Sequence, residues 1–372
     1  MKKVLFLFGT RPEAIKMAPL IKVFSGDSKF EVKVGVTAQH REMLDQVLSF
    51  FEITVDYDLN IMTPNQTLHQ LTADLISKIT NEILLKDHFD YVFVQGDTTT
   101  VLASAMAAFY QKIKIIHIEA GLRSHDMNSP FPEEMNRVLT SRLAHFHFSP
   151  TDTSKENLIR ENTTENVFVV GNTVIDALMS GLEKVNASSE EQLLEKYNFI
   201  NFKKKIVLVT CHRRENFGKP FEEICDALLE IANQFKEEVQ IVYPVHLNPN
   251  VKDVAYAKLI AENIKLITPL DYPELIWMMN KSSIILTDSG GIQEEAPSLG
   301  KPVLVLREVT ERTEGVEAGT AILVGSSKIK IVDETSKLLN DSEYYETISK
   351  AINPYGDGTT SEKIKAIISQ CR

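Results

Sequence analysis

Short apolar runs of strand length alternate with longer stretches of helical pattern almost throughout this chain, and that alternation limits its possible folds. A first series of runs occupies residues 4–8, 32–36, 91–94, 113–118 and 167–170, and a second occupies residues 206–209, 239–242, 264–267, 284–286 and 302–306. Strands separated by helices favour βαβ units with parallel strands. The sequence therefore predicts an α/β protein of two Rossmann-like parallel-sheet domains that face a central cleft.

The two series also predict the domain limits. We expect one domain over residues 1–172 and a second over residues 173–357. A helical pattern restarts at Ser361 after the breaker segment 353–358, so a last helix within 358–372 is expected to pack back on the first domain. Ligands of such folds bind at the carboxyl ends of the strands, where we look for chemistry.

Composition excludes several classes of function. The chain has 372 residues, 43% of them hydrophobic, which suffices for two cores. A net charge of -11 argues against nucleic acid and anionic membranes as partners. Cys211, Cys225 and Cys371 have no disulfide or metal-site spacing, so we expect a protein of the reducing cytoplasm. The apolar start imitates a signal peptide but ends at Gly9, so we predict a buried strand there.

A glycine loop follows one of the predicted strands of the second series. Ser289, Gly290 and Gly291 lie at a predicted helix start, where exposed amides favour an anion. The loop is not a Walker motif, because Lys301 lies far downstream and precedes Pro302. A turn that only packs strand against helix remains the alternative.

Charged residues gather at the strand ends of the first series. Arg11 and Lys16 lie in the first turns of a predicted helix, and Asp97 either caps a helix or acts as an acid or base, with capping the more common role for such a residue. Glu119 ends an otherwise buried strand, where a carboxylate is hard to explain structurally. Glu133 starts a helix and fits either dipole stabilisation or chemistry, with Arg137 one turn later.

The second series has a cationic cluster at a strand end. His212, Arg213 and Arg214 follow the run 206–209 directly, which indicates an anion site in an acidic protein. His246 is more typical of a packing residue. Together with the glycine loop the cluster predicts a nucleotide diphosphate, with Glu295 placed to accept hydrogen bonds from ribose hydroxyls.

Five motifs in order give the chain a resemblance to a known family. They are FGTRPEAIK at 8–16, GDT at 96–98, HIEAGLR at 117–123, HRREN at 212–216 and DSGGIQEE at 288–295. The chain resembles the non-hydrolysing bacterial UDP-N-acetylglucosamine 2-epimerases from end to end. The resemblance implies a glycosyltransferase-B-type fold, a homodimer, and reversible epimerisation at C2 that yields UDP-N-acetylmannosamine for surface polysaccharide synthesis, without NAD, metal or another cofactor.

The resemblance also assigns residues to roles. Those implied to bind UDP are Arg11, His212, Leu270, Leu275, Ser289, Gly290, Gly291, Glu295 and Arg312. Those implied to serve the sugar and its chemistry, together with His212, are Lys16, Asp97, Glu119, Glu133 and Arg137. UDP would leave to give a 2-acetamidoglucal and then add back, assisted by cations and by carboxylates placed about the sugar ring.

The sequence departs from the family pattern in three places. Leu275 stands where an aromatic residue often lies near the uracil, so backbone at Leu270 and aliphatic packing are expected to hold the base. Gln39, His40, Gln66 and His246 resemble a second site at which substrate activates some members, but Glu42 and Asn65 do not match it. Thr313 stands where Arg-Pro is usual after Arg312.

Three other functions stay open at this point. A hydrolysing epimerase would release UDP and free N-acetylmannosamine, and a glycosyltransferase of the same fold would leave C2 untouched. A non-catalytic nucleotide-sugar sensor would bind without turnover, although the carboxylates at the strand ends exceed what binding needs.

Overall fold

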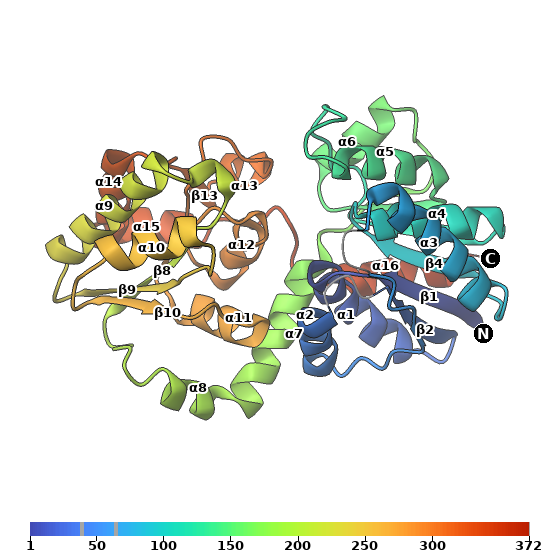
Figure 1. The fold of residues 1–372 in the computed structure, drawn as a ribbon, viewed down its shortest axis with the longest axis horizontal. Coiled ribbons are helices and arrows are strands. Elements are labelled where there is room, and N and C mark those ends of the chain that lie inside the picture. The colour runs from blue at the N-terminus through green and yellow to red at the C-terminus, as the bar shows by residue number, and fades with distance from the viewer. Residues whose placement is uncertain (38–40, 63–65, 372) are drawn as a thin grey trace. The chain divides into compact units, whose positions relative to one another are not determined.

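The computed structural model describes residues 1–37, 41–62 and 66–371, which form two compact units (Figure 1). Unit 1 comprises Met1–Ala177 and Tyr355–Arg372, and unit 2 comprises Leu178–Pro354. The chain thus passes from one unit to the other twice.

Unit 1 is built on a sheet of parallel strands in the order β3-β2-β1-β4-β5-β6-β7. Its strands are β1 (Lys2–Phe8), β2 (Phe30–Val36), β3 (Tyr57–Asp58), β4 (Tyr91–Gln95), β5 (Lys114–Ile118), β6 (Phe146–Ser149) and β7 (Val167–Val169). Its helices are α1 (Arg11–Ser25), α2 (Arg41–Phe50), α3 (Leu68–Lys78), the π-helix η1 (Ile79–Leu84), α4 (Thr99–Tyr110), α5 (Glu133–Leu143), α6 (Asp152–Arg160) and α16 (Thr360–Gln370).

Unit 2 repeats the plan with parallel strands in the order β10-β9-β8-β11-β12-β13. These strands are β8 (Lys205–Thr210), β9 (Val239–Pro244), β10 (Ile264–Ile267), β11 (Ile284–Thr287), β12 (Val303–Val305) and β13 (Ala321–Leu323). Helix α7 (Thr173–Ser188) leads into the unit, and the rest are α8 (Glu190–Lys196), η2 (Arg214–Asn216), α9 (Lys219–Gln234), α10 (Pro249–Lys258), α11 (Tyr272–Lys281), α12 (Gly290–Glu295), η3 (Ala296–Leu299), α13 (Thr313–Glu317), α14 (Lys328–Asn340) and α15 (Ser342–Ser349).

All ten predicted strands are present, and the prediction of two parallel-sheet α/β domains is confirmed. Three further strands, β3, β6 and β13, were not predicted from the apolar pattern. Strands β3 and β13 span only two and three residues, too few for a pattern to emerge. Strand β6 has the sequence Phe-His-Phe-Ser and is buried throughout, but its two polar residues interrupt the apolar run by which a buried strand is predicted.

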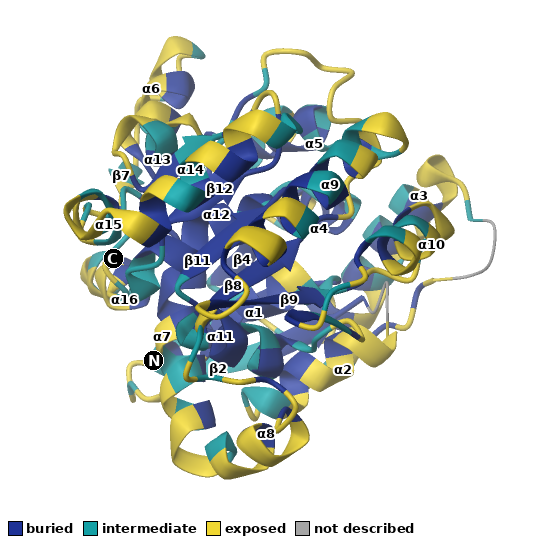
Figure 2. Ribbon diagram, turned by 90° about the vertical axis from the view of Figure 1, so that its left-hand side faces the viewer, coloured by how far each residue is buried: buried dark blue, intermediate teal, exposed yellow. Residues whose placement is uncertain are grey.

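The two faces of each sheet are covered, which explains why the strands are apolar runs rather than alternating ones. On one face of unit 1, Leu5 and Leu7 join a core with α3 and α4. On the other, the Phe6 ring stacks on Phe93 with centroids 4.4 Å apart, and both contact Phe24 of α1. Figure 2 shows the resulting pattern, with dark blue central strands and yellow outer helix surfaces.

The end of the chain returns to unit 1, where α16 packs against α1. Asp176 accepts hydrogen bonds from the backbone N–H groups of Ser361 and Thr360, at 2.7 and 3.3 Å, and so caps α16. No helix among the described residues is long and apolar enough to cross a membrane.

Two buried histidines lie side by side on neighbouring strands. His117 of β5 is in register with His147 of β6. Burial lowers the pKa of His117 to about 3 and that of His147 to about 4, from an ordinary value of 6.5. Both rings are therefore neutral near pH 7, and His117 Nε2 donates a hydrogen bond to the Gly96 carbonyl over 2.8 Å.

These histidines should make the fold sensitive to acid. Their folded pKa values are depressed, so their contribution to stability is present above pH 6.5 and is lost as the pH falls toward 4. The unfolding free energy of the wild type should therefore fall as the pH is lowered from 6.5 to 4. We predict that His147→Gln reduces the slope of this fall by roughly 1 kcal/mol per pH unit. Urea unfolding followed by circular dichroism measures this. The exposed His88→Gln should keep the wild-type slope, and an equal slope in both variants would contradict the assignment.

Candidate active site

The carboxyl ends of β1, β4 and β5 bring the predicted catalytic residues of unit 1 together. Glu119 follows β5 with a φ of 63°, in the left-handed region, which is uncommon for a residue with a side chain. Lys16 Nζ of α1 lies 2.8 and 2.7 Å from the two Glu119 carboxylate oxygens. Gln95, at the end of β4, also donates to this carboxylate, and Asn172 Nδ2 donates to it over 3.3 Å. Glu119 is thus held by one cation and two amides.

Asp97 forms a second carboxylate site beside the first. Its carboxylate is paired with Arg137, and its backbone carbonyl accepts from Asn136 Nδ2 over 2.8 Å. Burial raises the pKa of Asp97 above its ordinary value despite the nearby Arg137 guanidinium, and the charge on Glu119 raises it further. The two neighbouring carboxylates therefore have different environments.

The expectation that favoured Asp97 as a helix cap is wrong. The cap of α4 is Thr98, whose hydroxyl accepts from the Val101 amide over 3.3 Å. The Thr98 hydroxyl also donates to Glu13 Oε1 over 2.8 Å. Because the next residue does the capping, the Asp97 side chain is left for Arg137.

Glu13 is a buried carboxylate that the sequence analysis gave no role. It closes a capping box at the start of α1 and accepts hydrogen bonds from the amides of Gly9 and Thr10 at 3.0 and 2.7 Å. Since its other oxygen accepts from Thr98, Glu13 connects the loops after β1 and β4. Burial raises the pKa of Glu13, although the hydrogen bonds that its carboxylate accepts act to lower it. The sequence signal for this role is a Glu that follows a helix-capping Thr by three positions.

Arg11 and Glu133 are placed less directly. Arg11 is the first residue of α1, is half-buried, and has no ion pair with any residue that the structure describes. Glu133 begins α5 as predicted, but Arg137 pairs with Glu134, at 3.1 Å, rather than with Glu133. Glu134 is buried and accepts hydrogen bonds from the amides of Ser124 and His125. Of the two adjacent glutamates, Glu134 is therefore the one that holds the local structure.

In unit 2 the loops after β8 and β11 lie next to each other, because Thr210 and Thr287 end these paired strands. Asp288, fully buried after β11, accepts from the amides of His212 and Arg213 at 2.8 and 2.7 Å and from Asn216 at 3.1 Å. The predicted cationic cluster is thereby folded around a buried carboxylate, with the side chains of His212, Arg213 and Arg214 exposed. The part of the His212 ring that is covered by neighbouring atoms loses water, which lowers the pKa of His212, while the negative charge of Asp288 acts to raise it.

The glycine loop begins a helix, as predicted. Ser289 is the residue before α12, and its amide donates to the Thr287 hydroxyl over 3.0 Å. The amides of Gly290 and Gly291 have no acceptor among the described residues, as expected at the start of a helix. A side chain at Gly290 would place its Cβ 3.4 Å from the Arg312 guanidinium, so the glycine lets this cation pack against the helix start.

The remaining residues predicted for UDP surround this helix start. Arg312 Nε donates to the buried Glu294 over 2.8 Å, which fixes the guanidinium. Glu295 accepts from the Tyr272 hydroxyl over 3.4 Å. Leu275 on α11 and the preceding Leu270 are both half-buried.

The residues that resemble an activator site fall into two groups. Gln39 and His40 lie outside the described residues, and Gln66 donates to Asp74 over 2.9 Å. His246 is exposed rather than packed in a core, and its ring stacks on that of His212 with centroids 5.2 Å apart. The expectation of a packing role for His246 is therefore wrong.

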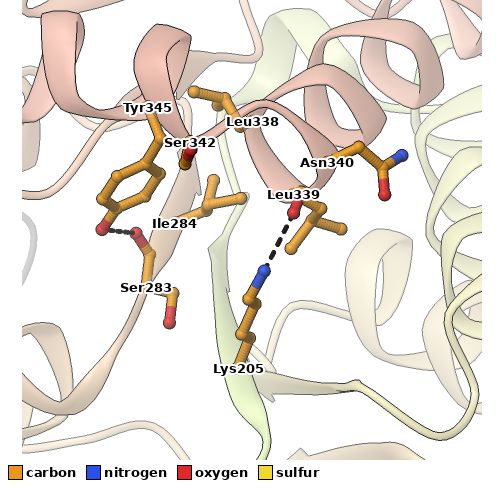
Figure 3. Close-up of a pocket in the computed structure, with 8 residues that line it drawn as sticks. All are labelled: Lys205, Ser283, Ile284, Leu338, Leu339, Asn340, Ser342 and Tyr345. Atoms are coloured by element: carbon orange, nitrogen blue, oxygen red, sulfur yellow. Dashed lines mark hydrogen bonds between the residues drawn. The ribbon is translucent and has the colours of Figure 1, made fainter.

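A cavity of about 340 Å³ in unit 2 lies at the other end of the strands (Figure 3). It is lined by Lys205 and Ile284, which begin β8 and β11, and by residues of α14 and α15. Lys205 Nζ donates to the Leu339 carbonyl at 2.9 Å and the Tyr345 hydroxyl donates to the Ser283 carbonyl at 2.9 Å. These polar groups are paired with the backbone, so the carboxyl ends of the strands are the better candidates for chemistry. Among residues 1–37, 41–62 and 66–371, no group of three His, Cys, Asp or Glu side chains could hold a metal ion.

Comparison with known proteins identifies the family of this chain. The family model for UDP-N-acetylglucosamine 2-epimerase matches residues 22–369. The UDP-N-acetylglucosamine 2-epimerase of Salmonella typhimurium is 54% identical over 374 residues, covering 100% of this chain and 99% of the relative. That of Campylobacter jejuni is 52% identical over 375 residues, covering 99% and 97%.

Solved structures give the same result. The Neisseria meningitidis UDP-GlcNAc 2-epimerase bound to UDP-GlcNAc has a TM-score of 0.90 at 50% identity, covering 99% of this chain and 100% of that one. The Methanocaldococcus jannaschii enzyme in complex with UDP-GlcNAc and UDP has a TM-score of 0.80 at 36% identity, covering 100% of both chains. With its strand-end carboxylates and glycine loop in a matching fold, this chain belongs to the UDP-N-acetylglucosamine 2-epimerase family.

Proposed function

We propose that this protein interconverts UDP-N-acetylglucosamine and UDP-N-acetylmannosamine by eliminating UDP and adding it back. Unit 2 would bind the UDP portion and unit 1 would act on the sugar. The observation that carries the proposal is the pair of neighbouring carboxylates in unit 1, Glu119 compensated by Lys16 and Asp97 with a raised pKa.

Unit 2 supplies groups suited to a diphosphate. The amides of Gly290 and Gly291 and the guanidinium of Arg312 meet at the start of α12. The loop that carries His212 and Arg213 follows the neighbouring strand. Amides at a helix start and fixed cations stabilise an anion, and they stabilise a leaving group more strongly as its charge develops.

The chemistry follows from the substrate. The hydrogen at C2 is not adjacent to a carbonyl, so its direct removal is unfavourable. Breaking the bond between C1 and oxygen first gives an oxocarbenium-like centre and makes that hydrogen acidic. Loss of the C2 proton to a carboxylate then forms a C1–C2 double bond, which is a 2-acetamidoglucal beside UDP. A proton delivered to the opposite face of C2, with return of UDP to C1, gives the epimer.

The two carboxylates of unit 1 suit different parts of this reaction. Asp97 is the group whose affinity for a proton is increased, so it is suited to exchange the proton on one face of C2. Protonation of the opposite face then requires a second proton donor or a glycal that turns over in the site. Glu119 has its charge compensated by Lys16 and its direction fixed by two amides. Such a fixed anion is suited to stabilise the positive charge that develops at C1.

The direct test is a proton NMR time course of UDP-N-acetylglucosamine with the pure protein in deuterated buffer. Deuterium entering C2 together with UDP-N-acetylmannosamine, with the diphosphate still attached at equilibrium, is the expected result. Accumulation of UDP with free N-acetylmannosamine would identify a hydrolysing enzyme instead. Absence of exchange would leave a glycosyltransferase or a sensor.

We predict that Glu119→Gln loses epimerisation by roughly 10²-fold to 10⁴-fold, because a neutral amide cannot replace the carboxylate in the reaction. UDP affinity, measured by isothermal titration calorimetry, should stay within about twofold, because Glu119 is not among the residues proposed to bind UDP. The exposed Glu165→Gln serves as the matched control and should behave like wild type. Unchanged turnover in Glu119→Gln would remove this residue from the mechanism.

We predict that Arg11→Ala weakens UDP binding by about tenfold, the effect of losing one charge-assisted hydrogen bond of roughly 1.4 kcal/mol. The half-buried guanidinium has no ion pair with a described residue, so it is available to a phosphate. Arg160→Ala is the control, since Arg160 is exposed and pairs only locally with Glu156. Equal UDP affinities for the two variants would assign Arg11 to another role.

The biological setting of the proposal follows from the resemblance. We expect a cytoplasmic homodimer that supplies UDP-N-acetylmannosamine for surface polysaccharide synthesis and needs no cofactor. Sedimentation equilibrium measures the oligomeric state, and full turnover after exhaustive treatment with EDTA checks the independence from metal.

A further inference from the structure

The chain passes between the units at two places, and both lie close to Asn172 of unit 1. Helix α7 leaves unit 1 after Ala177 and starts next to Asn172, and the chain re-enters unit 1 at Tyr355. Asn172 is 3% exposed. It received no role in the sequence analysis and has none in the reaction described above beyond its contact with Glu119.

Three hydrogen-bonding groups of Asn172 contact three different segments of the chain. Its backbone N–H donates to the Tyr355 carbonyl over 2.7 Å, which ties the returning chain to the start of α7. Its side-chain oxygen accepts from the Val174 amide over 3.1 Å and so caps the first turn of that helix. Its side-chain nitrogen donates to Glu119 Oε1 over 3.3 Å.

Two glycines fix the backbone on either side of these contacts. Gly171 has a φ of 97°, and a Cβ there would lie 2.7 Å from the Thr360 hydroxyl and 3.3 Å from the Tyr355 carbonyl. Gly356 has a φ of 138°, and a Cβ there would lie 3.5 Å from the Asn172 nitrogen. The segments approach too closely for side chains, so the position of Asn172 is set by backbone packing.

We propose that Asn172 is a positioning residue that holds the Glu119 carboxylate in its reactive orientation and ties it to the two segments that join the units. The proposal rests on the proposed function, because it concerns how Glu119 is used in epimerisation. It extends that function to a residue that need not touch the substrate.

The residue type supports a role beyond capping. Ser, Thr and Asp cap helices as well as Asn does, and capping uses only the side-chain oxygen. Of these four, only Asn carries an amide that both accepts from the helix and donates to a carboxylate without bringing charge. An Asp at this position would face Glu119 with a second negative charge, and a Ser would be too short to reach it.

Two variants separate the contact with Glu119 from the helix cap. Asn172→Ser retains an oxygen for the Val174 amide and loses the donor to Glu119. We expect its kcat for epimerisation to fall on the order of tenfold or more, since small misplacements of reacting groups are costly. UDP affinity should be unchanged, because Asn172 is not among the residues proposed to bind UDP.

Asn172→Asp also retains the cap but replaces the donor by an acceptor. We expect a larger loss of kcat at pH 8 than in Asn172→Ser, with partial recovery toward pH 5.5, where one proton shared by the two carboxyl groups restores a hydrogen bond. The titratable groups near Glu119 include Lys16, Asp97 and the neutral His117, and they are the same in wild type. The ratio of variant to wild-type kcat across this pH range therefore isolates the new pair.

Asp176→Ala provides the matched control for a weakened junction. Asp176 belongs to the same helix start but caps α16 and has no hydrogen bond to Glu119. Its replacement should lower the melting temperature, as loss of a cap does, while kcat stays within about twofold of wild type.

The outcomes separate the two proposals. Wild-type protein that fails to exchange the C2 hydrogen refutes the proposed function, and the role of Asn172 falls with it. Wild-type turnover with an unchanged kcat in Asn172→Ser refutes the role of Asn172 alone. An equal loss of kcat in Asp176→Ala, or a loss in Asn172→Asp that is the same at every pH, would mean that the contact with Glu119 is only structural.

Discussion

The rest of this structure depends on one kind of interaction, in which a buried carboxylate accepts hydrogen bonds from the backbone amides of loops. In unit 1, Glu13 accepts from the amides of Gly9 and Thr10 and from the Thr98 hydroxyl, which joins the loops after two neighbouring strands. In unit 2, Asp288 does the same for the amides of His212 and Arg213. A buried charge is tolerated only when donors compensate it, so each loop is held in one shape. The loops that carry candidate site residues in each unit are thus held by such a carboxylate.

The reactive groups are placed on these fixed loops. Lys16 lies in the helix that follows the first of the two loops that Glu13 connects, Asp97 lies in the second loop, and Glu119 follows the next strand in the sheet. Burial and neighbouring charges then give the carboxylates different properties, with the pKa of Asp97 raised and Glu119 opposite an ammonium group. Positioning and pKa adjustment therefore come from the same packing.

Much of this could be read from the sequence, because apolar runs, glycines and charged strand ends have local signatures. The ten predicted strands, the buried first strand and the helix start at Ser289 all have such signatures. Local patterns mislead where neighbouring residues can fill the same role. Thr98 rather than Asp97 caps α4, and Asp97 pairs instead with Arg137 of α5. That pair joins positions 40 residues apart, and no periodic pattern contains such a contact.

The sequence by itself determined the fold class, the residues at the strand ends and the family, since these follow from local periodicity and from motifs in fixed order. The tertiary structure decided the pairings: Lys16 with Glu119, Asp97 with Arg137, and Asn172 with Glu119. Members of these pairs are separated by 103, 40 and 53 positions. A contact over such a distance forms only when the sheet orders its strands, because strand order rather than chain order sets which side chains meet.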